Sequence, residues 1–526
     1  MSGMRKFFAR WLRWSGLAPA ACLGLLFCSC RMTSTTVSTP PSLVILISID
    51  TLRADRLGGY GNNDALTPNL DRLSRESMLF SMSHSQACST LPSHASLFTS
   101  RYPLQLGVLS GAAHQVIPTQ VPILFEMLHQ AGYYTASFNG GGYLDGSYGF
   151  DRGVDFLQEN LDFSHSVPLV ISLIETRMTD GEKRAERQPL FVFLHSYDVH
   201  RPYGYDERLA EYFELDAVYR TILSGIQRLE QRFVDHPMTF EEYLSLTSTE
   251  QIDLMCLWLL DTDRYLKLFH ASDRTRVDDH LMFDVAMKLW SASVHYEAQR
   301  NLLQRCYDIG VRDADAHLGI LFAALKRLAI WDRTLLIVCS DHGEEFMEHG
   351  MVTHPPEFYE TLIHTPLLVK APGRVIAPLV LGNPVGNIDI FPTICDLCGI
   401  HTPPETVGTS LALLRQDTGR NDRVFFSEEV DLSRGDLRAA VLTERYKLIQ
   451  VGLEKKQAFD LQEDPGELRP NGEEAWRALG HDAELLIDRV KFFRSTVESE
   501  QSEPDGEGSE IDQVLRDRLD GLGYVH

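Results

Sequence analysis

Acidic and histidine side chains follow three separate apolar runs of the sequence. They are Asp50 after the run at 43–49, His195 after the run at 190–194, and Asp341 and His342 after the run at 335–339. Carboxylate oxygens and imidazole nitrogens are ligands of hard-to-borderline divalent cations. One aspartate at a strand end is more often a helix cap or a turn residue, but three such places in one chain favour a metal site.

A fourth segment carries hydroxyl groups around a proline. Residues 89–99 read Ser-Thr-Leu-Pro-Ser-His-Ala-Ser-Leu-Phe-Thr, with an apolar helical pattern after the proline. A helix that begins here would direct free backbone N–H groups and the positive end of its dipole towards an anion. A hydroxyl at this place can act as a nucleophile if a metal lowers its pKa. The alternative is an ordinary Ser or Thr N-cap with a proline in the first turn.

The same apolar runs predict the fold that would position these groups. Each run is continuous, as is typical of a parallel strand covered on both faces. Helix-like stretches lie between them, for example at 121–131 and 314–328. Alternating strands and helices predict an α/β fold with a mainly parallel central sheet flanked by helices. Such sheets bind ligands outside the carboxyl ends of their strands, where the metal site is therefore expected.

Composition excludes several classes of protein. The 526 residues are 44% hydrophobic and 23% charged, which is ordinary for globular proteins and excludes wholesale disorder, collagen and coiled coil. The 73 Asp+Glu exceed the 49 Lys+Arg, for a net charge of −24. This excess opposes nonspecific binding of nucleic acid and anionic lipid, so no nucleic-acid partner is expected. A metal or a basic pocket must therefore attract any anionic substrate locally.

The first thirty residues are typical of an export signal. Four basic residues between positions 5 and 13 precede an apolar stretch at 17–27, which is too short to span a bilayer. The stretch ends in Leu-Leu-Phe-Cys-Ser-Cys, which resembles a bacterial lipoprotein cleavage site with Cys30 as the lipidated residue. Plain cleavage nearby or an uncleaved anchor is the alternative. We expect an extracytoplasmic protein, in the bacterial periplasm or on the outer surface, that meets the membrane only through a lipid anchor at Cys30.

Six further cysteines are scattered along the chain and do not indicate a disulfide framework. Two of them, Cys395 and Cys398, lie in a helix-like apolar stretch at 390–400 and are predicted to pack in the core.

The order and spacing of these segments resemble the sulfatase family of the alkaline-phosphatase superfamily. The matching strings lie at 49–61, 67–73, 92–103, 197–203 and 340–350, with smaller ones at 359–367, 446–448 and 459–467. The resemblance covers roughly residues 42–205 and 300–470. It implies an alkaline-phosphatase-like α/β domain, a small C-terminal antiparallel-sheet subdomain, and a metal-dependent hydrolase or transferase of phosphate or sulfate esters.

The resemblance also implies roles for single residues. The implied metal ligands are Asp50, Asp341 and His342. Thr90 lies at the place of the family's nucleophile, which also contacts the metal, and His195 has a counterpart among the metal ligands of two-zinc phosphoethanolamine transferases. His200 and His354 match positions that bind the transferred group or a second metal. His94 replaces an arginine of the family and is a further candidate for catalysis. His195 could instead be a packed strand-end histidine, and His349 and Glu345 are expected to be structural. Zinc or manganese is the favoured ion, with calcium or magnesium possible.

The departures from the family pattern concern the reaction itself. True sulfatases carry Cys-x-Pro-Ser-Arg, whose cysteine becomes formylglycine, whereas this chain has Thr90-Leu-Pro-Ser-His. Threonine cannot be converted in that way, and Cys88 comes two residues too early. Thr51 replaces a common second acidic ligand, and Ser-Phe-Asn-Gly-Gly-Gly at 137–142 stands where many sulfatases place Lys and His. A phosphothreonine can be hydrolysed, but a sulfothreonine has no equally easy exit, so phosphorus chemistry is favoured.

The predicted substrate is an anionic ester of a glycan, a lipid headgroup or a small molecule. Two alternatives stay open. One is a phosphoethanolamine-type phosphotransferase acting on an envelope glycolipid, and the other is a catalytically dead pseudoenzyme that binds an anion or glycan.

The predicted domain organisation has five parts: a leader at 1–30, a tether at 31–42, a catalytic α/β domain at 43–400, a C-terminal α+β subdomain at 401–497, and an acidic linker with a short terminal helix at 498–526. Helical periodicity at 218–233, 254–269 and 280–303 predicts a helical insertion over 206–300. The insertion could cover the site as a lid or simply extend the fold. The C-terminal subdomain is predicted to hold strands at 424–426, 439–442 and 446–451 and a helix at 475–497.

Overall fold

The computed structural model describes most of the chain after the predicted leader. The described ranges are 40–109, 115–178, 188–203, 217–270, 296–372, 379–412, 423–431, 436–453, 455–470 and 472–500. The predicted leader, most of the tether and the predicted terminal helix lie outside these ranges. Within the described ranges, no helix is both long enough and apolar enough to cross a membrane.

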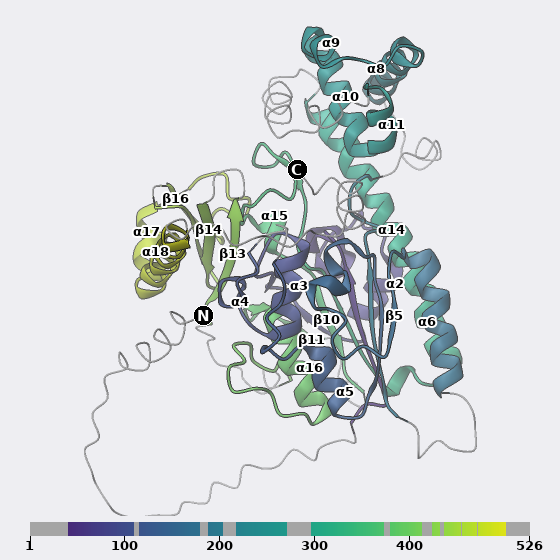
Figure 1. The fold of residues 1–526 in the computed structure, drawn as a ribbon, viewed down its shortest axis with the longest axis vertical. Coiled ribbons are helices and arrows are strands. Elements are labelled where there is room, and N and C mark those ends of the chain that lie inside the picture. The colour runs from purple at the N-terminus through teal and green to yellow at the C-terminus, as the bar shows by residue number, and fades with distance from the viewer. Residues whose placement is uncertain are drawn as a thin grey trace, which may run out of the picture. The chain divides into compact units, whose positions relative to one another are not determined.

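An eight-stranded sheet lies at the centre of the described chain, in the order β11-β2-β10-β7-β1-β6-β4-β5 (Figure 1). Its strands are β1 (Leu43–Ile49), β2 (Met78–Phe80), β4 (Tyr134–Phe138), β5 (Phe156–Gln158), β6 (Leu190–Ser196), β7 (Thr334–Cys339), β10 (Leu367–Lys370) and β11 (Leu379–Leu381). All neighbours pair in parallel except β10, which is antiparallel to both β2 and β7. The predicted α/β class with a mainly parallel central sheet is confirmed.

The continuous apolar runs form strands because both faces of the sheet are covered. Alternate residues of β1 enter two different cores, with Ile45 and Ile47 in the first and Val44 and Leu46 in the second. The first face is covered by α2 (Pro68–Ser74), α6 (Phe163–Met178) and α14 (Tyr296–Arg327), and the second by α3 (Thr90–Thr99), α5 (Leu124–Gln130) and α16 (Ile390–Cys398) (Figure 1). As predicted, Cys395 and Cys398 are buried in the second core.

Four helices of the predicted insertion are described: α8 (Ala217–Phe233), α9 (Phe240–Ser245), α10 (Ser248–Leu260) and α11 (Thr262–Lys267). They share one continuous apolar core with α14. The helix predicted over 254–269 is wrong as a single element, because Asp261 ends α10 and its carboxylate accepts the Arg264 N–H at 3.0 Å to cap α11. The helix predicted over 280–303 lies partly outside the described residues, and its last residues belong to α14, which continues to Arg327.

A separate antiparallel sheet follows the main sheet along the chain. It consists of β13 (Phe425–Asp431), β14 (Asp436–Leu442), β15 (Tyr446–Val451) and β16 (Lys455–Asp460), covered by α17 (Gly472–Leu479) and α18 (His481–Glu500). The sequence did not predict β16, because Lys455, Lys456 and Gln457 make the first half of this strand polar, without the alternation of apolar and polar residues that indicates a strand. The single helix predicted over 475–497 is wrong, because Gly480 adopts a left-handed conformation (φ 47°) and separates α17 from α18.

Several short elements connect the longer ones. They are β3 (Ser83–His84), α4 (Pro103–Leu106), β8 (Glu345–Phe346), β9 (Val352–Thr353), α15 (Glu360–Ile363) and β12 (Val385–Gly386). The start of α15 is held against Gly343, whose N–H donates to the Leu362 carbonyl at 2.7 Å. A Cβ atom on Gly343 would lie 2.0 Å from the Thr361 carbonyl oxygen. The glycine after His342 is therefore required by a close backbone approach.

We predict that Gly343→Ala lowers the free energy of unfolding by about 2–3 kcal/mol, because a backbone carbonyl cannot rotate away from the added methyl group. Urea unfolding followed by circular dichroism measures the change. Gly382→Ala is the matched control, since a Cβ atom on Gly382 would lie 4.0 Å from its nearest neighbour, Ser81 Oγ. Equal stability of the two variants would contradict the prediction.

Candidate functional site

Three neighbouring strands bring their polar ends to one edge of the main sheet. In the parallel register, Ser48 of β1 lies opposite both His195 of β6 and Cys339 of β7. The residues that follow β1 and β7, including Asp50 and Asp341, therefore leave the sheet at the same level. The sequence prediction that these side chains share an edge rested on this geometry of parallel strands.

The turn after β1 is fixed by buried hydrogen bonds. Thr51 is left-handed (φ 55°), a conformation that costs a non-glycine residue about 1–2 kcal/mol. Its N–H donates to Asp341 Oδ1 at 3.2 Å, and its carbonyl accepts from the buried Tyr307 hydroxyl at 2.8 Å. The same hydroxyl accepts the Arg53 N–H at 2.9 Å. Tyr307 on α14 thus holds the Asp50 turn in place, which no sequence pattern had indicated.

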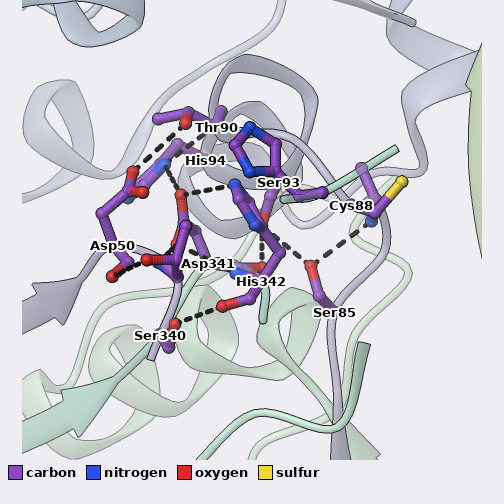
Figure 2. Close-up of polar contacts among 12 residues, drawn as sticks. Asp50, Ser85, Cys88, Thr90, Ser93, His94, Ser340, Asp341 and His342 are labelled. Carbon is purple, nitrogen blue, oxygen red and sulfur yellow. Dashed lines mark hydrogen bonds and ion pairs between the residues drawn. The ribbon is translucent and has the colours of Figure 1, made fainter. Parts of the chain in front are cut away.

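Thr90 is the first residue of α3, at the positive end of the helix dipole. Its side chain is fully buried, and its hydroxyl donates to Asp50 Oδ2 at 3.2 Å (Figure 2). One turn further, the Ser93 hydroxyl donates to the Asp341 carbonyl at 2.7 Å and lies 2.9 Å from Ser85 Oγ. The start of α3 is therefore bound to the ends of both β1 and β7.

Four buried polar atoms in this cluster have no hydrogen-bond partner: Asp50 Oδ1, Asp341 Oδ2, His342 Nε2 and His195 Nε2. Asp50, Asp341 and His342 each offer an atom within 4.8 Å of the others. Burial, followed by the charge of Asp341, raises the pKa of Asp50 well above its ordinary value. Two buried carboxylates with unpaired oxygens are costly unless a cation compensates them. The donor set fits one divalent cation with oxygen and nitrogen ligands.

The hydrogen bonds of His342 and His94 show which of these two imidazoles has a nitrogen available to a metal. His342 Nδ1 donates to the Gly343 carbonyl at 2.9 Å, so its Nε2 lone pair faces Asp341 at 3.5 Å and suits a metal. His94 Nδ1 donates to the Thr90 carbonyl at 2.9 Å, and its Nε2 accepts from the Ser48 hydroxyl at 2.9 Å. Both nitrogens of His94 are therefore occupied, which suits a residue that positions Thr90 better than one that binds metal or substrate.

His195 also differs from a simple ligand. Its Nδ1 lies 3.4 Å from the Gly140 N–H, which can only donate, so the proton of the neutral ring belongs on Nε2. That nitrogen faces Asp50 Oδ2 at 3.5 Å. Burial lowers the pKa of His195 well below its ordinary value, so the ring is neutral near pH 7. This arrangement fits a hydrogen-bond donor to Asp50 or to a bound anion.

A second row of histidines continues from His342. The His342 and His354 ring centroids are 4.6 Å apart, and those of His354 and His200 are 5.2 Å apart. His354 Nδ1 donates to Glu344 Oε1 at 3.1 Å, and Glu344 Oε2 is buried without a hydrogen-bond partner. Burial lowers the pKa of His200 to about 3, so its ring is neutral at physiological pH. The sequence had indicated both histidines but not Glu344, although it lies two residues after His342.

Cys88 does not have the environment of a nucleophile. Its thiol donates to Glu429 Oε2 at 3.0 Å, and its N–H donates to the same oxygen at 3.0 Å. Burial, followed by the charge of Glu429, raises the pKa of the thiol well above its ordinary value. Only the thiolate is strongly nucleophilic, so this cysteine is inert near pH 7. Its contact with β13 instead fixes the segment that leads into Thr90.

His349 lies outside the candidate site, as expected. Its Nδ1 is 2.8 Å from Glu345 Oε1, and its Nε2 is 3.1 Å from the Gly466 carbonyl oxygen. Two acceptors require that both nitrogens donate, so the bound ring is an imidazolium. Burial alone would lower the pKa of His349, but the hydrogen bond and charge of Glu345 outweigh it and raise the pKa. The ring also stacks on Tyr359 at 3.6 Å between centroids.

Two family models match the chain. The sulfatase family model matches residues 42–400, and the C-terminal model of N-sulphoglucosamine sulphohydrolase matches residues 348–478. The chain belongs to the sulfatase family. Proteins named as sulfatases and as phosphonate monoester hydrolases are among those to which the chain is similar.

Individual proteins match either part of the chain or its fold at low sequence identity. A choline-sulfatase of Rhizobium meliloti is 33% identical over 168 residues, which are 31% of this chain and 32% of that relative, so the match spans about a third of its length. A protein solved with its substrate D-glucosamine-2-N,6-O-disulfate superposes with a TM-score of 0.62 at 17% identity, covering 90% of this chain and 100% of the other. The phosphonate monoester hydrolase of Agrobacterium radiobacter superposes with a TM-score of 0.58 at 18% sequence identity. The superposition covers 87% of this chain and 96% of the other. These two structures show the shared fold.

We predict that the stabilising effect of His349 decreases as the pH rises. The folded state raises the pKa of His349 above its unfolded value near 6.5, so its contribution is complete below that pH and is lost as the pH passes the folded pKa. The difference in melting temperature between the wild type and His349→Gln should therefore be largest at pH 6 and shrink towards pH 9. A pH-independent difference for His349→Gln would contradict the assignment.

We also predict that Asp341→Asn abolishes retention of a divalent cation, because it removes a charged oxygen from the ligand set. Metal content after dialysis, measured by mass spectrometry, should be near one ion per chain or more in the wild type and near zero in the variant. Chelation should lower wild-type stability by about 3 kcal/mol if the metal was present at 100 times its Kd. Asp389→Asn is the control, since Asp389 is equally buried but is bound to Gly386, Thr409 and Arg423. Full metal content in Asp341→Asn would refute the site.

Proposed function

We propose that this chain is a metal-dependent, extracytoplasmic ester hydrolase that cleaves phosphate or phosphonate esters with Thr90 as the nucleophile. One observation carries the proposal. The buried Thr90 hydroxyl, at the start of α3, donates to the Asp50 carboxylate, which lies among buried carboxylate and imidazole atoms that have no hydrogen-bond partner. Family membership supports ester hydrolysis as the class of reaction.

Asp50, Asp341 and His342 would hold the cation, with Thr90 beside it. When bound, a divalent cation supplies Lewis-acid polarisation and lowers the pKa of a neighbouring hydroxyl. Asp50 Oδ1 has no hydrogen-bond partner and is available to the cation. Asp50 Oδ2 accepts the hydrogen bond of the Thr90 hydroxyl and is available to accept its proton. The proton lost by Thr90 Oγ1 therefore goes to Asp50 Oδ2.

The remaining residues serve the transferred group. Thr90 Oγ1 attacks phosphorus, and the alcohol leaves from the opposite side. We assign the stabilisation of the developing negative charge to the N-terminal N–H groups of α3, to His195 Nε2–H and to the neutral rings of His200 and His354. Water then attacks the phosphorus of the Thr90 ester and breaks its bond to Thr90 Oγ1. Asp50 Oδ2 returns its proton to that oxygen, and the phosphate or phosphonate anion is released. His94 acts indirectly, through its bond to the Thr90 carbonyl.

Phosphorus is favoured over sulfur because of the residue at position 90. Sulfatases that use formylglycine expel sulfate when a hemiacetal collapses, and threonine offers no such route. Sulfate-ester hydrolysis is the second candidate, and the 33% identity to a choline-sulfatase favours it. An anionic ester of a glycan, a lipid headgroup or a small molecule is the proposed substrate class for either reaction. Export and anchoring at Cys30 remain part of the proposal on the strength of the leader sequence.

We predict that Thr90→Ala lowers kcat on nitrophenyl phosphate esters by about 10³-fold or more, the usual cost of removing a nucleophile. The assay compares phosphate monoester, phosphate diester, phosphonate and sulfate substrates with zinc- or manganese-loaded protein. Thr99→Ala is the matched control, because Thr99 lies on the same helix with its hydroxyl on the Ala95 carbonyl, and its activity should stay within twofold of the wild type.

The substrate panel separates the candidate functions. Phosphoester turnover that depends on Thr90 supports the proposal. Turnover of sulfate alone would support the second candidate and show that the mechanism is wrong. Binding of metal and inorganic anion without turnover of any ester would favour a phosphotransferase that lacks its acceptor or a binding pseudoenzyme.

A further inference from the structure

Tyr197 is an aromatic side chain of the candidate site, on the loop that follows β6. Its ring makes edge-to-face contacts with two histidines. The distance between ring centroids is 4.8 Å to His195 and 5.6 Å to His200. Both histidines are buried, whereas Tyr197 is partly exposed. The ring is thus a part of the site that solvent, and therefore a ligand, can reach.

The Tyr197 ring also completes a closed circuit of neighbouring side chains that includes the proposed metal ligands. In order, each next to the following one and the last next to the first, they are Asp50, His195, Tyr197, His200, His354, His342 and Asp341. The Thr90 hydroxyl joins this circuit through its hydrogen bond to Asp50. Tyr197 differs from the other members because a phenol is neutral near pH 7 and presents mostly carbon. The side of the circuit that Tyr197 forms is therefore aromatic and uncharged.

Two glycines after β4 determine where this ring lies. A Cβ atom on Gly140 would be 2.3 Å from Cδ2 of Tyr197, so the ring needs a glycine at this position. The Tyr197 hydroxyl donates to the Gly141 carbonyl at 3.2 Å. That bond uses the only proton of the hydroxyl, so the side chain has no donor left for an oxygen of a ligand. What Tyr197 offers to a ligand is its ring.

The geometry of the proposed reaction decides which part of a substrate would meet such a ring. In an in-line attack, Thr90 Oγ1 and the leaving alcohol lie on opposite sides of phosphorus, and three other groups lie around it. A phosphate monoester has three oxygens there, and each of them needs a hydrogen-bond donor or a cation. A phosphonate monoester or a phosphodiester has two oxygens and one organic group. A ring without a free donor suits the organic group and would leave an oxygen in its place without a partner.

We propose that the Tyr197 ring contacts the organic group that stays on phosphorus, and that this residue selects phosphonate monoesters and phosphodiesters over phosphate monoesters. This inference rests on the proposed function, because it narrows the substrate class of the same site. It also explains the glycine at position 140, since any side chain there would displace the ring from its place between His195 and His200.

The binding of two anions to the metal-loaded, full-length chain tests this selectivity without turnover. Inorganic phosphate presents only oxygens, whereas phenylphosphonate has a phenyl group in place of one oxygen. Calorimetry gives both dissociation constants, with metal content and melting temperature recorded for each protein. The wild type should bind phenylphosphonate about three- to tenfold more tightly than phosphate, as expected for one aromatic contact. Equal affinity, tighter binding of phosphate, or binding of neither anion would overturn the role of Tyr197.

Four variants assign the preference to the ring. Tyr197→Leu should abolish the preference while its phosphate affinity stays within twofold of the wild type, and Tyr197→Phe should keep the preference because it keeps the ring. Gly140→Ala should reduce the preference, because its Cβ atom would displace the ring. Tyr134→Leu is the matched control, since Tyr134 is also partly exposed but lies at the start of β4, where its ring contacts the Arg177 guanidinium. It should show the wild-type preference.

The outcomes distinguish this inference from the proposed function. A preference for phenylphosphonate that depends on Tyr197, without turnover of any ester, would contradict only the proposed function. Phosphoester turnover together with a preference that survives in Tyr197→Leu would overturn only the role of Tyr197. If Tyr197→Leu unfolds or loses its metal, Gly140→Ala decides in its place, because it moves the ring without removing it. An unchanged preference in Gly140→Ala would then overturn the inference.

Discussion

Two buried carboxylates facing one another are the constraint on which the rest of the site depends. Asp50 and Asp341 leave neighbouring parallel strands at the same level, and each keeps an oxygen without a hydrogen-bond partner. Such a pair is stable only with a proton or a cation between the groups, and a divalent ion with His342 as a further ligand satisfies all three residues at once. The Thr90 hydroxyl bonds to the same cluster, so the group proposed for catalysis and the groups proposed for metal binding share one electrostatic environment.

The parts of the chain outside the main sheet support this cluster from separate directions. Strand β13 of the C-terminal sheet binds the segment before α3, where Glu429 accepts two hydrogen bonds from Cys88. Helix α14 binds the Asp50 turn through Tyr307, and α10 binds the loop after His200 through Leu259. Each of these contacts includes a backbone group of a segment that carries the site. The C-terminal sheet and the insertion therefore support the site by fixing its backbone.

The sequence predicted the parts of this structure that depend on local pattern. Continuous apolar runs identified β1, β6 and β7, and the geometry of parallel strands then placed Asp50, Asp341 and His342 at one edge. The sequence could not predict features that depend on contacts between distant segments. The bonds of His94 to Ser48 and Thr90, the support of Thr51 by Tyr307, and the stacking of Arg201 on Trp258 each join residues that no periodicity relates. The splits at Asp261 and Gly480 were missed because helical periodicity continues across a short break.

Anomalous diffraction from crystals of the zinc-loaded chain would show whether the buried carboxylates hold a cation beside Thr90. We expect an anomalous peak at the zinc absorption edge, bound by Asp50, Asp341 and His342 and in contact with Thr90 Oγ1. A well-ordered cluster without a peak, or a peak held by other residues, would contradict the claim that these buried carboxylates exist to hold a cation beside Thr90.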